Sequence, residues 1–130
     1  MMRDMDVVKK VLLAIEENYK TVALFNYDLK IDGLDMETTA YHCKILHDGG
    51  FVSDYKAQFA DGHIYLFRVG SLTWEGHDFL DKIRDDSTWA KTKETIKSKG
   101  LPMTLDAIKT VANGIIKASV EAAMKSIIGS

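Results

Sequence analysis

The sequence passes directly from a helix pattern to a hairpin pattern at Gly49-Gly50. Residues 36–48 keep apolar side chains at helical spacing, and the glycine pair that follows predicts a helix C-terminal cap. Residues 51–59 then alternate, Asp61-Gly62 is a turn dipeptide, and residues 63–69 resume an aromatic and β-branched run. A helix that runs directly into a hairpin, with further helices on either side, predicts an α+β fold.

The residues before this junction predict one helix and an extended stretch. The helix opens near Asp4 or Asp6, either of which can cap free backbone N–H groups, and its apolar stripe runs to Tyr19. Residues 21–25 and 27–31 are predicted to be extended.

Three helices are predicted after the hairpin. The first has Thr73 as its N-cap, and the second is a sparse helix from the Ser87 cap to Lys99. Gly100–Met103, which is followed by the Thr104 cap, predicts a joint before a last helix from Leu105 to about Ile128.

Composition limits the chain to a small folded protein. It has 130 residues, a mass of 14.6 kDa and a formal net charge of −2. No apolar run reaches 18 residues, and the single cysteine, Cys43, has no partner for an internal disulfide. We expect a cytoplasmic protein without a membrane partner, with a main body in residues 1–100 and a C-terminal helix in residues 101–130.

The order of helix, extended segment, helix, hairpin and helix indicates a winged helix-turn-helix-like domain. In that interpretation Met36–Asp48 is the recognition helix and Ser53–Val69 is the wing. Residues 22–33 look more extended than helical, so the usual preceding helix is either short or replaced by a strand.

Two stretches also resemble known sequences. Thr39–Val52 is similar to the "YHLKLLxEAGLV" run of winged-helix regulators. Leu72–Asp86, together with Trp89, resembles the "LTWEGHEFLDxIRDxxxW" signature of an uncharacterised family that is common in phage and prophage genomes. The resemblance implies a winged-helix-like fold and a mobile-element setting, and it implies no activity.

A winged helix that binds DNA reads base edges from its recognition helix and holds phosphates with basic groups. The candidate contacts are the predicted outward side chains of the recognition helix and the polar side chains of the hairpin. They are Thr38, Tyr41, His42, Lys44, Lys56, His63 and Arg68.

The charge balance keeps a second hypothesis open. Met36–Asp48 holds one lysine against Glu37 and Asp48, whereas DNA binding needs several phosphate contacts. The leading prediction is a regulatory module that binds double-stranded DNA as a dimer. The alternative is an adaptor that uses the same surface to hold a host or phage protein.

The sequence predicts no catalytic residues, metal site or cofactor. His42 and His47 are five residues apart, which places them about 140° apart around a helix and prevents shared metal ligation. Cys43 falls on the expected buried face, where a thiol is inert. We therefore expect that the protein is not an enzyme.

Trp74 and Trp89 have two interpretations. They are either part of a recognition surface or core residues. We favour packing of Trp74 under the wing at its helix start, with Gly76 allowing a close helix contact.

The last helix carries a long apolar stripe that a domain of this size does not fully cover. Its candidate oligomerisation residues follow a spacing of three or four, and they are Leu105, Ile108, Ala112, Ile115 and Ser119. The stripe would fold back on the first helix, pair with a second copy or lie on a membrane. Asp106 and Glu121 dilute the basic charge and aromatic anchors are absent, which disfavours a membrane surface. Winged-helix proteins often dimerise through terminal helices, and this resemblance implies a homodimer that uses the last helix.

Overall fold

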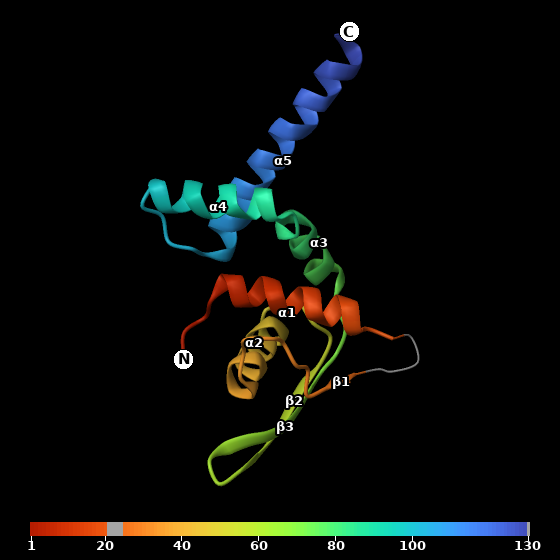
Figure 1. The fold of residues 1–130 in the computed structure, drawn as a ribbon, viewed down its shortest axis with the longest axis vertical. Helices are drawn as coiled ribbons and strands as arrows, with labels where there is room; N and C mark the ends of the chain where they lie inside the picture. The colour runs from red at the N-terminus through yellow and green to blue at the C-terminus, as the bar shows by residue number, and fades with distance from the viewer. Residues whose placement is uncertain (21–24, 130) are drawn as a thin grey trace. The chain divides into compact units, whose positions relative to one another are not determined.

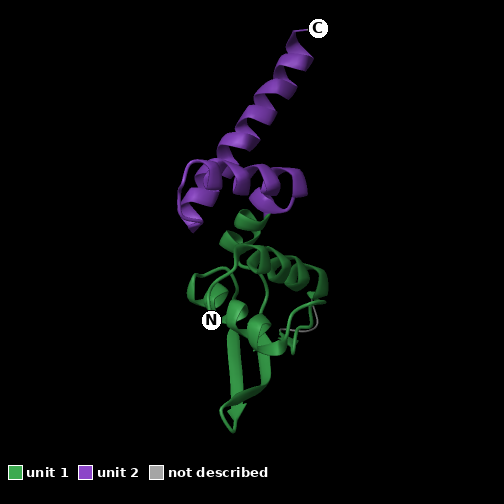
Figure 2. Ribbon diagram, turned by 60° about the vertical axis from the view of Figure 1, so that its left-hand side comes forward, with its two compact units in different colours: residues 1–80 green, residues 81–130 purple. Residues whose placement is uncertain are grey.

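A computed structural model describes residues 1–20 and 25–129 of the chain (Figure 1). Within these residues it contains five helices and one three-stranded antiparallel sheet, which confirms the predicted α+β class. The chain forms two compact units, Met1–Leu80 and Asp81–Ser130 (Figure 2). The units therefore divide between Leu80 and Asp81, not at Gly100–Met103 as expected, because the helix before Gly100 packs against the helix after it.

Helix α1 (Met5–Asn18) provides much of the core of unit 1. Asp4 caps it, since its carboxylate accepts a hydrogen bond from the Asp6 N–H at 2.9 Å. The predicted apolar stripe is buried as far as Ile15, whereas Tyr19 is exposed. Helix α1 packs on helix α2 (Met36–Asp48).

Helix α2 begins and ends where the sequence predicts. The Asp35 carboxylate accepts a hydrogen bond from the Thr38 N–H at 2.7 Å, and hydrogen bonding to Thr38 lowers the pKa of Asp35. Gly50 ends the helix with a φ of +82°, which allows the Phe51 N–H to donate to the Leu46 carbonyl at 2.8 Å.

The hairpin consists of β2 (Tyr55–Ala60) and β3 (His63–Val69), joined by Asp61 and Gly62 with φ values of 54° and 78°. Both positive values are typical of the tight turn that a hairpin favours. The register shifts between Gln58 and Phe59. The predicted hairpin is therefore confirmed.

A short strand, β1 (Asn26–Tyr27), pairs with β3 and gives the sheet order β1-β3-β2. The chain leaves this strand at Asp28, whose φ is 47° and whose carboxylate accepts a hydrogen bond from the Phe67 N–H at 3.0 Å. The extended prediction for residues 27–31 is therefore correct only at its start. Residues 21–24, also predicted to be extended, lie outside the described residues.

Helix α3 (Trp74–Ile83) begins at the Thr73 cap, which accepts a hydrogen bond from the Gly76 N–H at 3.1 Å. A Cβ at Gly76 would lie 2.1 Å from the Phe51 carbonyl oxygen. Gly76 therefore allows a close contact, as predicted, but the contact is with the backbone of a loop and not with a helix. The predicted packing of Trp74 under the wing is wrong, because its side chain is 82% exposed. Trp74 precedes the buried Ile83 by nine residues, which places the two on opposite sides of the helix.

Unit 2 contains helices α4 (Asp86–Ser98) and α5 (Leu105–Ile128), which pack against each other. Asp85 caps α4 through a 2.8 Å bond from the Thr88 N–H, so the predicted Ser87 cap is wrong. Thr104 caps α5 as predicted, accepting from the Ala107 N–H at 3.2 Å.

Two glycines provide a matched test of these contacts. We expect Gly76→Ala to lower the free energy of unfolding by about 1–3 kcal/mol, because the new methyl group must displace the Phe51 carbonyl. A Cβ at Gly114, within α5, meets no heavy atom within 4 Å. Gly114→Ala should therefore raise the stability by about 0.5–1 kcal/mol through helix propensity. Urea unfolding followed by circular dichroism measures both, and equal effects of the two substitutions would contradict the close approach.

Candidate functional site

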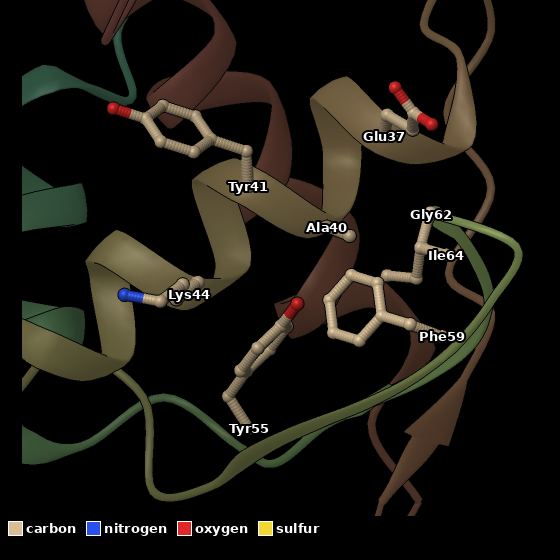
Figure 3. Close-up of a pocket in the computed structure, with 8 residues that line it drawn as sticks. All are labelled: Glu37, Ala40, Tyr41, Lys44, Tyr55, Phe59, Gly62 and Ile64. Carbon is tan, nitrogen blue, oxygen red and sulfur yellow. The ribbon is translucent and has the colours of Figure 1, made fainter. Parts of the chain in front are cut away.

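A groove of about 280 Å³ lies between α2 and the hairpin, wholly within unit 1 (Figure 3). Tyr55 and Phe59 extend from the hairpin toward α2, and Ala40 lies on the helix between them and Tyr41. The groove is lined by Glu37, Ala40, Tyr41, Lys44, Tyr55, Phe59, Gly62 and Ile64.

The groove holds two of the predicted DNA contacts, Tyr41 and Lys44. Lys56 and Arg68 instead line a separate hollow of about 150 Å³, together with Tyr27 and Leu66. Successive strand residues point to opposite faces of the hairpin. Lys56 therefore lies on the other face from Tyr55, which lines the groove beside Tyr41 and Lys44.

The other predicted contacts have different positions. His63 is exposed at the hairpin tip, with Nδ1 3.3 Å from Glu37 Oε1. Thr38, in the first turn of α2, is half-buried. The candidate residues therefore do not form one continuous surface.

The prediction that His42 faces outward is wrong. Its side chain is buried, and Nε2 accepts a hydrogen bond from the Asp4 N–H at 3.0 Å. Its Nδ1 lies 2.8 Å from the Thr38 carbonyl oxygen, which can only accept, so this nitrogen carries the proton. His42 thus links α2 to the cap of α1 and has no access to a base edge.

Most basic side chains of the predicted DNA surface already have a carboxylate partner. Lys44 Nζ lies 2.9 Å from Asp48 Oδ2, and Arg68 Nε lies 2.9 Å from Asp54 Oδ2. The Arg68 guanidinium also lies over the Phe25 ring, 4.2 Å from its centre. In the described part of the chain, Lys56 has no acidic partner.

The two units carry opposite net charge. Residues 1–80 contain eight Lys and Arg against thirteen Asp and Glu, a net charge of −5. Residues 81–130 contain nine against six, a net charge of +3. The surface that resembles a DNA reader thus belongs to the acidic unit.

The groove itself is mainly aromatic and apolar. The Phe59 side chain is 68% exposed. Among the described residues none makes a hydrogen bond to the Tyr55 hydroxyl, whose pKa is raised by partial burial. The alternation of residues 51–59 places Tyr55 and Phe59 on one strand face, and this signal could have identified them from the sequence.

No catalytic or metal-binding arrangement stands out in the described residues. Cys43 is fully buried, and burial raises the pKa of its thiol to about 12, so it stays protonated at neutral pH. Within residues 1–20 and 25–129 no group of three or more His, Cys, Asp or Glu side chains could hold a metal ion.

A second candidate surface is the C-terminal half of α5. Of the predicted oligomerisation residues, Ile108 and Ala112 are buried, so their assignment to an intermolecular surface is wrong. They lie in the part of α5 that crosses α4 (Figure 1). Leu105 and Ile115 are half-buried and Ser119 is exposed. The apolar side chains that remain exposed lie further along, at Val120, Met124, Ile127 and Ile128.

Comparison with known proteins gives a family but no activity. Residues 2–102 match the profile of a family described as "Hypothetical protein (DUF2513)". A protein of Haemophilus influenzae with the printed name "Uncharacterized protein" is 39% identical over 116 residues, which cover 89% of this chain and 96% of that relative. No solved structure matches the chain. None of the described helices is both long and apolar enough to cross a membrane.

Proposed function

The chain belongs to the DUF2513 family, and we propose that its first unit is a variant winged-helix domain that binds a protein partner. The order α1-β1-α2-β2-β3 and the sheet order β1-β3-β2 support the winged-helix comparison. The variation lies before α2, where residues 28–35 contain turns and no helix. The sequence resemblance to a family of phage and prophage genomes adds a mobile-element setting to this proposal.

The charge of the surface formed by α2 and the hairpin favours a protein partner over DNA. DNA affinity depends on cationic groups that replace the counterions of phosphates. Here Lys44 and Arg68 lie beside carboxylates, Glu37 lies beside His63, and the whole unit has a net charge of −5. A duplex approaching this surface would meet acidic groups at most of the proposed contacts.

Exposed aromatic side chains give positive support for a protein partner. Phe59, Tyr65 and Trp74 are all more than half exposed in unit 1. Aromatic residues are enriched among the side chains that dominate protein–protein affinity. Acidic charge and exposed aromatic rings together suit a partner with basic and apolar residues.

DNA binding is the second candidate. It is favoured by the hairpin and by Lys56, which has no acidic partner within residues 1–20 and 25–129. Fluorescence anisotropy of a labelled 30-base-pair random duplex distinguishes the two. We expect the full chain to show no binding stronger than about 100 µM at 200 mM NaCl, the weak end of non-specific affinity.

A dissociation constant in the micromolar range that weakens steeply with salt would contradict the protein-binding proposal. Weakening by Lys56→Ala, but not by Lys30→Ala on another exposed lysine of unit 1, would then assign DNA binding to the wing.

We also propose that the chain forms a dimer through the second half of α5. Ile116, Val120, Ala123 and Ile127 follow a spacing of four, three and four, which is the seam of a two-stranded coiled coil. Asn113 lies one heptad before Val120, and asparagine at such a position is typical of parallel dimers. In a parallel pair the seam is flanked by the exposed residues Lys117, Ser119, Met124 and Ser126, so no like charges oppose each other across it.

Sedimentation analysis of the full chain tests this part. We expect a dimer that Val120→Glu combined with Ile127→Glu converts to a monomer, because two carboxylates would enter the apolar seam. The control is Gly114→Glu with Ala118→Glu, which adds the same charge to the other side of the helix and should leave the dimer intact. A monomeric wild type at 100 µM, or equal dissociation by both double variants, would contradict the seam.

A further inference from the structure

The groove between α2 and the hairpin has the size of a receptor for one anchoring side chain. Its volume of about 280 Å³ lies at the lower end of the range that is typical of small-molecule pockets. Peptide recognition commonly places one or a few side chains in such hollows while the rest of the segment stays on the surface. The dimensions therefore suit one inserted side chain of a protein segment.

The walls of the groove select an apolar or aromatic anchor. Tyr55, Phe59 and Ile64 come from the hairpin, and Ala40 and Tyr41 come from α2. Phe59 leaves most of its ring in water, and an inserted apolar side chain would remove that surface from solvent. The Tyr55 hydroxyl, which has no hydrogen-bond partner among the described residues, is available to a polar group of the same segment.

The acidic rim of the groove favours a lysine or arginine next to the inserted side chain. The Glu37 carboxylate is 55% exposed, and its one ion-pair partner among the described residues is the imidazole of His63, at 3.3 Å. The Lys44 charge at the other end is offset by Asp48, and Asp35 and Asp61 are exposed at the start of α2 and in the hairpin turn. Lysine or arginine near the anchor would meet complementary charge, whereas an acidic segment would be repelled.

We propose that this groove binds a protein segment that places one apolar or aromatic side chain between Tyr55 and Phe59, with lysine or arginine beside it at Glu37. The inference rests on the protein-binding function of unit 1 and adds the site and the chemistry of the partner. Phe59 supplies apolar contact, and Glu37 supplies charge selectivity.

Selection from a phage-displayed library of random 12-residue peptides on the full chain supplies the probe. We expect the selected sequences to share an aromatic or large aliphatic residue within three positions of lysine or arginine. The synthetic consensus peptide, titrated into ¹⁵N-labelled protein, should shift amide signals of α2 and of residues 55–64. Absence of selected binders, or of this pairing of residues, would overturn the inference.

Four variants of the full chain locate the site. Phe59→Ala should weaken the consensus peptide at least tenfold, and Glu37→Gln about threefold to tenfold, with a reduced salt dependence. The controls remove an exposed aromatic ring and a carboxylate elsewhere in unit 1, and Trp74→Ala and Glu75→Gln should both change the affinity less than twofold. Amide spectra of all four variants verify that each keeps the fold.

The outcomes separate the inference from the function on which it depends. If the peptides bind Phe59→Ala as tightly as the wild type, or lose affinity in Trp74→Ala, the groove is not the binding site. Unit 1 would still bind proteins, through another surface. A chain that selects no peptide and binds duplex DNA through Lys56 would overturn both.

Discussion

The backbone of Phe51 is the point that fixes the geometry of unit 1. Its N–H donates to the Leu46 carbonyl at 2.8 Å, and its own carbonyl accepts from the Thr73 N–H at 3.0 Å. The Thr73 hydroxyl donates to the Gly50 carbonyl at 2.6 Å, and Gly76 lies so close to the Phe51 carbonyl that no Cβ fits. These contacts tie the end of α2, the entry to the hairpin and the start of α3 to one place, so the direction in which the hairpin leaves α2 is set by backbone atoms.

The groove is a consequence of that junction. Helix α2 and the hairpin are held together at Phe51 and meet again where His63 Nδ1 lies 3.3 Å from Glu37 Oε1. The small side chain of Ala40 leaves space between these two points. The same arrangement in a DNA reader would present basic groups, but here carboxylates accompany Lys44 and Arg68. Ion pairs at exposed sites add little stability, so their main effect on this surface is to cancel positive charge. The charge of this surface thus supports the protein partner that we propose.

Local signals in the sequence were sufficient for most helix and strand boundaries. Asp4, Thr73 and Thr104 cap helices as predicted, and the paired glycines and the Asp61-Gly62 turn give the end of α2 and the hairpin. Each of these features depends on residues within four positions of one another.

Predictions that needed a distant partner were less successful. His42 precedes Cys43 on α2 and lies about 100° from it around the helix, and it is buried because its ring meets the Asp4 N–H, 38 residues away. Trp74 is exposed because the covered face of α3 begins at Gly76, which the composition of the helix does not reveal. The stripe of α5 looks uniform in the sequence, yet Ile108 and Ala112 are buried and Val120 and Ile127 are exposed. The spacing in the sequence shows one continuous apolar stripe, whereas tertiary packing buries only part of it.

Residual dipolar couplings of the backbone N–H vectors test whether α2 and the hairpin form one fixed unit. We expect the couplings of residues 36–48 and 55–69 to fit a single alignment tensor with α2 and the hairpin oriented as in the structure. If the helix and the hairpin each required a separate tensor, the junction at Phe51 would not fix the groove.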